Sequence, residues 1–262
     1  NSPGFPEGIS GLDLGEKLQK QAERFGTQIE LGEVMGLASD GTHVKLQTTS
    51  GELSAKTVLI ATGSDYKKLG ISGEAEYFAR GVHYCATCDG AFYRDKRLVV
   101  VGGGNSAVQE AIFLTKFASK IDILVRGDKM RASEVLQHEL ENHKDKITVH
   151  FNTTTDEIIA EDNKVVAVRG THDGQEKRIE TDGVFIFIGL LPNTGFLKDT
   201  DIELDEIGLV KTNDRLETAV PGVFCAGDVR SGATMQIASA VGEGATAALR
   251  IREYIDAHNR AS

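Results

Sequence analysis

The segment CATCDGAFYRDKRLVVVGGGNSA, residues 85–107, decides how the whole chain is interpreted. It joins a Cys-x-x-Cys pair to an apolar run at 98–101, which is typical of a buried strand. That run passes directly into three glycines, 102–104, after which we expect a helix over 106–117. A pair of thiols and a glycine turn of the kind that approaches phosphates therefore occupy one short stretch, a combination suited to moving electrons between a nicotinamide and a protein disulfide.

The glycine turn has the pattern Gly-x-Gly-x-x-Ala, with Gly102, Gly104 and Ala107 at its fixed positions. Glycines let the backbone approach a pyrophosphate, and the following helix offers the N–H groups of Asn105 and Ser106. Glycine turns also simply join strands to helices, so the pattern alone is weak. The strand before it and the helix after it favour a dinucleotide-binding turn.

The residues after the next expected strand, 120–125, indicate which nicotinamide cofactor binds. A carboxylate at this place would bind a ribose hydroxyl, whereas arginines accept a 2′-phosphate. The chain has Arg126 at the strand end and Arg131 five residues later, with Lys129 between them. A solvated basic surface is the alternative, but the pattern favours a phosphate clamp and hence NADPH.

The Cys85–Cys88 spacing fits either a redox disulfide or half of a zinc site. A second Cys-x-x-Cys is absent from the sequence and His83 alone does not complete a ligand set, so we expect a redox disulfide. Asp89 either exchanges protons with a departing thiolate or caps a turn. Cys225, alone in an apolar strand, is expected to be inert core.

Composition limits the class of protein. The chain has 262 residues, 40% hydrophobic and 26% charged, which are values typical of a globular protein. A formal net charge of −10 argues against nucleic acid or an anionic membrane as the partner. No apolar run is long enough to span a bilayer, and no signal-peptide pattern opens the chain. We therefore expect a cytoplasmic protein.

Elsewhere the pattern alternates between helices and strands. We expect an amphipathic helix over 12–25, a small meander with strands at 28–31, 43–48 and 52–53, and a hairpin turn at 172–174. Buried strands ending in glycine turns are expected at 57–63, 98–104 and 183–189, and another at 221–228 stops at Gly-Asp. A long final helix is expected over 236–258.

Taken together, CATCDG, VVVGGGNSA, the ATG at 61–63 and PGVFCAGD at 221–228 resemble the low-molecular-weight thioredoxin reductases, which are FAD/NAD(P)-dependent pyridine nucleotide-disulfide oxidoreductases. The resemblance implies an α/β fold of two three-layer nucleotide-binding, Rossmann-like domains. An NADPH domain at 67–190 would be inserted in a discontinuous FAD domain made of 1–66 and 191–262.

The resemblance also implies the site residues. Cys85 and Cys88 would form the redox disulfide, with Asp89 as its acid/base. The expected FAD contacts are Asn1, Ala61, Thr62, Gly63, Gly227, Asp228 and Gln236. The expected NADPH contacts are Gly102, Gly104, Asn105, Ser106, Ala107, Arg126 and Arg131.

The implied activity passes electrons from NADPH through FAD to the Cys85–Cys88 disulfide and on to thioredoxin or a similar protein, in a homodimer. We expect Cys85 to be the exposed attacking thiol and Cys88 to face the flavin. Two alternatives stay open from the residues alone. One is a disulfide reductase that takes electrons from ferredoxin or another donor, and the other is a flavin-free redox-sensing module.

The sequence departs from the family pattern at three places. The Gly-x-Gly-x-x-Gly turn that the resemblance implies for the FAD pyrophosphate has no counterpart in the sequence as given, so we expect this sequence to start at least about 30 residues late, roughly one βαβ unit plus a loop. A chain that really began at Asn1 is expected to fold poorly and bind FAD weakly. Gly127 replaces one of two paired arginines, which weakens discrimination between NADPH and NADH. Met235 replaces the arginine expected before Gln236.

Overall fold

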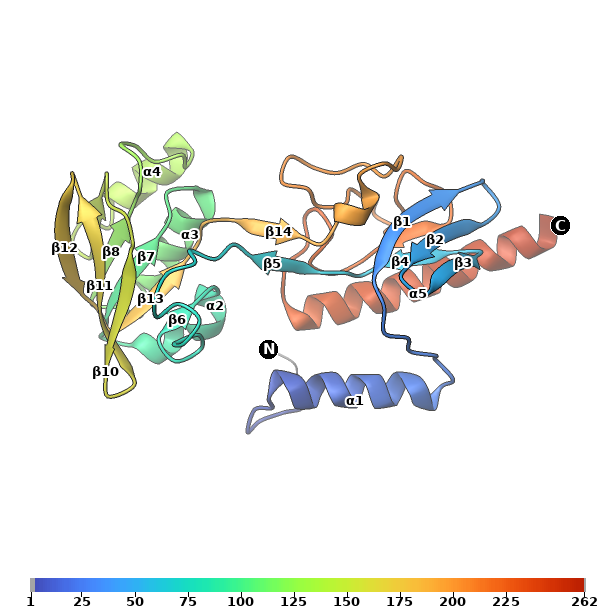
Figure 1. The fold of residues 1–262 in the computed structure, drawn as a ribbon, viewed down its shortest axis with the longest axis horizontal. Coiled ribbons are helices and arrows are strands. Elements are labelled where there is room, and N and C mark those ends of the chain that lie inside the picture. Colours follow the sequence, from blue (N-terminus) through green and yellow to red (C-terminus); the bar gives the residue numbers. More distant parts are fainter. Residues whose placement is uncertain (1–2, 262) are drawn as a thin grey trace. The chain divides into compact units, whose positions relative to one another are not determined.

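A computed structural model describes residues 3–261, which fold as two compact units (Figure 1). Unit 1 comprises Asn1–Asp65 and Leu191–Ser262, and unit 2 is Tyr66–Leu190. The chain passes between them along β5 (Ser64–Tyr66) and β14 (Leu190–Pro192), which pair as a two-stranded sheet. Asn1, an expected FAD contact, lies outside the described residues.

Unit 2 is built on a five-stranded sheet whose neighbouring strands are all parallel. Its order is β6 (Val82–His83), β13 (Gly183–Ile186), β7 (Arg97–Val101), β8 (Lys120–Leu124) and β9 (Ile147–His150). Every residue of β13 is buried, as are all residues of β7 after Arg97. Strands covered on both faces read as continuous apolar runs, which explains the pattern at 98–101.

One face of this sheet is covered by helices and the other by a second sheet (Figure 1). Helices α3 (Asn105–Leu114) and α4 (Glu134–Glu141) contribute Val108, Leu114 and Leu140 to the first core. An antiparallel meander covers the other face; its strands are β10 (Glu157–Glu161), β11 (Lys164–His172) and β12 (Gln175–Glu180). The predicted hairpin turn at 172–174 is present between β11 and β12, with Asp173 and Gly174 at φ 47° and 81°.

Two short helices connect the parallel strands β6 and β7 of unit 2. Helix α2 (Ala86–Asp89) follows β6 after two residues, and the 3₁₀ helix η1 (Gly90–Tyr93) continues from it. Gly90 lies so close to Leu114 of α3 that a Cβ would come within 2.8 Å of its side chain. The Cys-x-x-Cys segment is thereby packed against the helix that follows the glycine turn.

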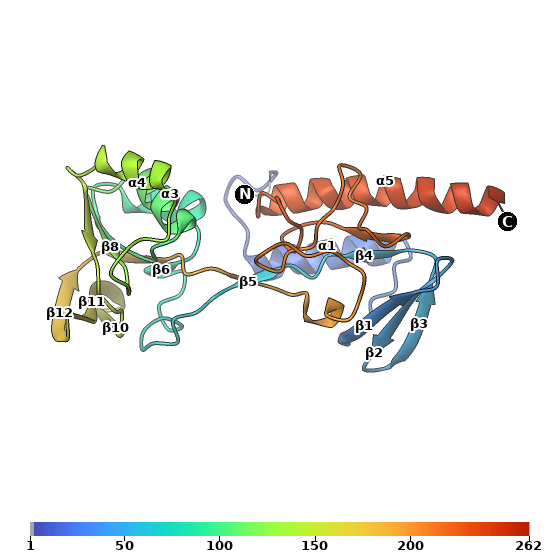
Figure 2. The ribbon, with the colours of Figure 1, turned by 90° about the horizontal axis from the view of Figure 1, so that it is seen from above.

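Unit 1 consists of an antiparallel meander, a parallel strand pair and two helices (Figure 2). The meander is β1 (Val34–Ser39), β2 (Val44–Thr48) and β3 (Gly51–Ala55); the parallel pair is β4 (Val58–Ile60) with β15 (Val223–Cys225). The helices are α1 (Gly11–Arg24) and α5 (Ile237–Ala261), and η2 (Gly195–Leu197) is a single 3₁₀ turn. The core of the pair includes the free Cys225, which is fully buried, and burial raises its pKa to about 12, so its thiol stays protonated at neutral pH.

One sequence-based expectation for the meander is wrong. Residues 28–31 form no strand; the first strand starts at Val34, and Ile29 and Leu31 are exposed. The reason is pairing, because β1 takes its register from β2 beginning at Val34 opposite Thr48. An alternating stretch that finds no partner strand does not become a strand.

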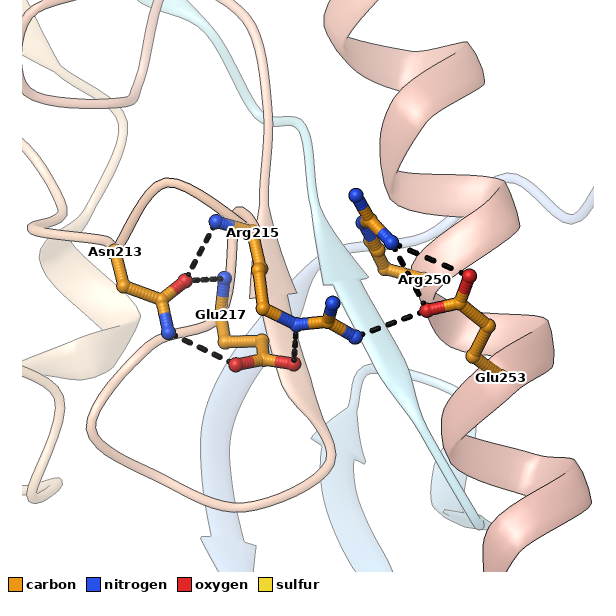
Figure 3. A network of polar contacts seen from close by, with 5 residues as sticks. All are labelled: Asn213, Arg215, Glu217, Arg250 and Glu253. Carbon is orange, nitrogen blue, oxygen red and sulfur yellow. Dashed lines mark hydrogen bonds and ion pairs between the residues drawn. The ribbon is translucent and has the colours of Figure 1, made fainter.

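A polar network fastens the segment before β15 to α5 (Figure 3). The Arg215 guanidinium donates to Glu217 (3.1 Å) and to Glu253 of α5 (2.9 Å), while Arg250 donates to the same Glu253 carboxylate (3.0 Å). The Asn213 amide donates to Glu217 at 2.8 Å. The groups are largely solvent-exposed, so the network orients the segment more than it stabilises the fold.

The tightest packing in unit 2 gives a direct test of the fold. Gly170 of β11 lies against the backbone of Thr154, whose carbonyl oxygen would be inside van der Waals contact of an added Cβ. We expect Gly170→Ala to lower the free energy of unfolding by about 1–3 kcal/mol, because backbone cannot move aside cheaply. Urea unfolding of unit 2 measures it.

Gly127→Ala is the matched control, because the nearest atom to its added Cβ is the Lys129 carbonyl oxygen at 3.9 Å. That change should alter stability by less than about 0.5 kcal/mol. Equal stability of the two variants would contradict the packing around β11.

Candidate functional site

The Cys-x-x-Cys segment forms a disulfide at the end of β6. Cys85 and Cys88 are bonded, with their Cα atoms 5.3 Å apart, and the N–H of Cys88 donates to the Cys85 sulfur at 3.1 Å. Their exposure is the reverse of the prediction: Cys88 is exposed and Cys85 is half-buried. Cys85 follows the buried Tyr84 directly, whereas Cys88 lies a helical turn further out. Cys88 is therefore the more exposed residue of the pair.

The carboxylate of Asp89, the residue after Cys88, contacts a buried histidine. Its Oδ2 lies 3.1 Å from Nδ1 of His83, and Nε2 of the same imidazole lies 2.7 Å from the Tyr93 hydroxyl. His83 is 5% exposed, while the Asp89 side chain is 30% exposed. Sequence reasoning considered His83 only as a metal ligand and did not single out Tyr93. His83, Asp89 and Tyr93 come from three different elements (β6, α2 and η1), so no single helical or strand period in the sequence groups them.

Burial, reinforced by the carboxylates of Asp89 and Asp182, raises the pKa of Tyr93 to about 12. The Tyr93 phenol therefore stays protonated at neutral pH and can donate its proton to a hydrogen bond.

The glycine turn lies at the carboxyl end of β7. Gly102 has φ 141°, and an added Cβ would come within 2.9 Å of Ala107, so side chains are excluded there. An added Cβ on Gly104 would meet nothing within 4 Å, which leaves this backbone facing open space. Helix α3 begins at Asn105, and its first N–H groups have no acceptor inside the helix. This arrangement fits a pyrophosphate group.

The segment carrying the basic residues is tied to that turn. The Gly103 carbonyl accepts the N–H of Arg131 at 2.7 Å, and the Asn105 side-chain oxygen accepts the N–H of Ser133 at 2.8 Å. Arg126 and Arg131 are both exposed, and within residues 3–261 neither guanidinium has an ion pair. Two free guanidinium groups beside a phosphate-type turn fit the 2′-phosphate of NADPH. The Asn105 side chain, by contrast, is used to hold the loop.

In unit 1 the expected flavin contacts gather where β4 and β15 end. The strands are parallel, with Ile60 opposite Cys225, so the turns that follow them meet at one edge. Gly63 and Gly227 have φ 69° and 78°, conformations that favour glycine. The Ser64 hydroxyl donates to the Asp228 carbonyl at 2.6 Å and joins the two turns.

The side chains at this edge are polar acceptors and donors. Burial, and then the charge of Glu243, raises the pKa of Asp228. The Glu243 carboxylate accepts the N–H of Gly227 at 2.8 Å and pairs with Arg230 at 2.6 Å, which fixes the turn. A half-buried carboxylate beside two glycine turns fits a ribityl hydroxyl of FAD. The Arg230–Glu243 pair was not found from the sequence, because its members lie 13 residues apart in a loop and a helix.

The remaining turn residues are arranged around this edge. The Thr62 hydroxyl donates to the Asn193 carbonyl at 2.8 Å, and Ala61 is exposed beside it. Gln236 directly precedes α5, and its carbonyl accepts the N–H of Ala240 at 2.9 Å.

Residues 3–261 contain no group of three His, Cys, Asp or Glu side chains that could hold a metal ion. Among those same residues, no helix is both long and apolar enough to cross a membrane.

The chain is similar in sequence to known proteins. The family described as pyridine nucleotide-disulphide oxidoreductase matches residues 1–244. Thioredoxin reductase of Bacillus subtilis (strain 168) is 43% identical over 258 residues, covering 98% of this chain and 81% of that relative. Thioredoxin reductase of Treponema pallidum (strain Nichols) is 39% identical, covering 98% and 83%.

Solved structures agree with these sequence relatives. The crystal structure of thioredoxin reductase from Streptococcus pyogenes is similar with a TM-score of 0.91 at 41% identity, covering 98% of this chain and 84% of that one. Thioredoxin reductase from Giardia duodenalis also gives 0.91, at 33% identity, covering 97% and 84%. The predicted α/β fold with Rossmann-like domains is confirmed by these matches, and this group of enzymes uses FAD and NADPH.

A disulfide beside a dinucleotide-type turn, in a chain that matches thioredoxin reductases over nearly its whole length, leaves one conclusion. The chain belongs to the pyridine nucleotide-disulphide oxidoreductase family, as a thioredoxin reductase-like flavoenzyme.

Proposed function

We propose that the Cys85–Cys88 disulfide is the group through which this enzyme delivers electrons to a disulfide of thioredoxin or a similar protein. The observation that carries the proposal is the disulfide itself, formed at the carboxyl end of β6 with Cys88 exposed. A partner protein must reach one sulfur directly, and an exposed Cys88 meets that need. The carboxylate of Asp89, held by the buried imidazole of His83, also supports a redox role, because thiol exchange needs an acid/base group and a purely structural disulfide does not.

The cofactor roles follow the two units. We assign the FAD domain to 1–66 with 191–262 and the NADPH domain to 67–190. Bound FAD supplies a two-electron carrier that is reduced by NADPH. The FAD-facing residues would be Ala61, Thr62, Gly63, Gly227, Asp228 and Gln236, with Asn1 among them by resemblance. The NADPH-facing residues would be Gly102, Gly104, Asn105, Ser106, Ala107, Arg126 and Arg131.

The exchange reaction can be written for the chain's own groups. The Cys88 thiolate attacks one sulfur of the partner disulfide, that S–S bond breaks, and the departing sulfur takes a proton from Asp89. The Cys85 thiol then gives its proton to the Asp89 carboxylate and attacks the Cys88 sulfur. The Cys85–Cys88 bond forms, and the second partner sulfur leaves. Two electrons pass to the partner.

The proposed partner is inferred from the relatives. Thioredoxin is the partner that these relatives imply, and a homodimer and a cytoplasmic location stay predictions.

Single cysteine variants test the order of attack. Both Cys85→Ser and Cys88→Ser should abolish thioredoxin reduction, because each removes one half of the dithiol. Only Cys85→Ser should accumulate a covalent mixed disulfide with thioredoxin, since it keeps the exposed attacking sulfur. Non-reducing mass spectrometry of the mixture measures the adduct. An adduct formed only by Cys88→Ser would show that Cys85, not Cys88, attacks the partner disulfide. Unchanged turnover in either variant would contradict the proposal.

Charge removal tests the phosphate clamp. Arg126→Ala and Arg131→Ala should each raise KM for NADPH by about 10- to 100-fold, because each removes a charge-assisted hydrogen bond to the 2′-phosphate. KM for NADH should barely change. Arg178→Ala is the control, since it removes an exposed guanidinium on β12 that pairs with Glu180. Equal effects on NADPH and NADH would contradict the clamp.

A further inference from the structure

The cluster of Asp89, His83 and Tyr93 is built from rigid elements and not from a loop. His83 is the last residue of β6 and lies opposite Phe185 of β13, on whose ring it stacks with centroids 5.1 Å apart. Tyr93 ends η1, and its ring packs where Gly183 has no side chain. The imidazole therefore has one position, with one nitrogen toward each partner.

Burial makes the two contacts of the imidazole a requirement. A ring nitrogen without a partner would cost free energy at a site only 5% exposed. Asp89 as a carboxylate only accepts, so Nδ1 of His83 carries the hydrogen and Nε2 accepts the Tyr93 hydroxyl proton. The raised pKa of Tyr93, about 12, keeps that phenol a donor.

The hydrogen bonds among Asp89, His83 and Tyr93 can also form when Asp89 is protonated. When the carboxyl group carries a proton it donates to Nδ1, the imidazole hydrogen sits on Nε2, and the Tyr93 oxygen accepts it. Only hydrogens change position in this exchange, and the heavy atoms of the three side chains can stay in place, because both hydrogen bonds reverse their direction. Asp182 is a further charged group that acts on Tyr93. One oxygen of its carboxylate lies 3.8 Å from the Lys96 Nζ, and the other accepts the N–H of Arg97.

We propose that His83 and Tyr93 are positioning residues for Asp89, holding its carboxyl group beside the disulfide in both protonation states. The inference rests on the proposed function, in which Asp89 gives a proton to the departing partner sulfur and takes one from the Cys85 thiol. In this scheme His83 acts through Asp89, whose carboxylate lies 3.1 Å from its Nδ1. Replacing His83 should therefore slow the exchange reaction only when residue 89 is an aspartate that can carry a proton.

A single-turnover assay measures this step by itself. The protein is reduced, freed of reductant, mixed with oxidised thioredoxin and quenched with an alkylating reagent, and the remaining Cys85 and Cys88 thiols are counted by mass. Asp89→Asn should slow exchange roughly 100-fold or more, the usual worth of a general acid. His83→Ala should slow it by about 10- to 100-fold, and His138→Ala, on the exposed surface of α4, should leave the rate unchanged.

Two comparisons separate positioning from simple loss of structure. In the Asp89→Asn background, His83→Ala and Tyr93→Phe should cause no further slowing. His83→Asn places its amide group near the Nδ1 position, where the nitrogen can donate to the carboxylate and the oxygen, after a flip of the amide, can accept from the protonated carboxyl group. It should restore the rate to within about threefold, whereas His83→Gln, which reaches the Nε2 position, should not. The Asn and Gln variants keep the test valid where His83→Ala does not fold.

The possible failures are distinguishable. Equal slowing by His83→Asn and His83→Gln, or a full His83→Ala effect in the Asp89→Asn background, overturns the positioning role. Normal exchange in Asp89→Asn also overturns it, while leaving the disulfide reductase standing. Absence of exchange in the wild-type protein, or exchange that survives Cys88→Ser, rejects the proposed function itself.

Discussion

The parallel pairing of β13 with both β6 and β7 is the constraint on which the rest of unit 2 depends. Val184 lies opposite Val82 on one side and Val99 on the other, so the three strands run in register and end at the same edge. The Cys-x-x-Cys segment leaves β6 at that edge, and the glycine turn leaves β7 there. Ligands of open α/β sheets bind at the carboxyl ends of strands. The sheet thereby places the redox disulfide and the dinucleotide-type turn at the same edge.

The same pairing explains why a histidine can precede the disulfide. At the end of β6 the side chain enters the sheet's core, where Phe185 provides a stacking surface and Asp89 and Tyr93 take up both nitrogens. An imidazole is tolerated in such a place only when it is fully hydrogen-bonded. Unit 1 has a comparable feature, since the Glu243 carboxylate of α5 accepts the N–H of Gly227 in the turn after β15 and pairs with Arg230.

Much of this architecture could be predicted from the sequence, because local patterns specify it. The apolar run at 98–101, the glycine turn and the hairpin at 172–174 were predicted with their neighbours and are present. Contacts between distant residues were not predictable. The strand expected at 28–31 lacks a partner strand, and the exposure of Cys88 depends on how α2 packs. The His83–Tyr93 contact joins the side chain of a strand to that of a 3₁₀ helix ten residues later.

The measurement that tests the central claim most directly is an anaerobic addition of NADPH to the FAD-loaded protein, followed by thiol labelling. The visible flavin absorbance and the labelling of Cys85 and Cys88 are recorded on the same sample. The account predicts that the absorbance falls and that both cysteines become labelled. A flavin that loses its absorbance while the Cys85–Cys88 disulfide stays unlabelled would contradict it, because electrons would then not reach the disulfide.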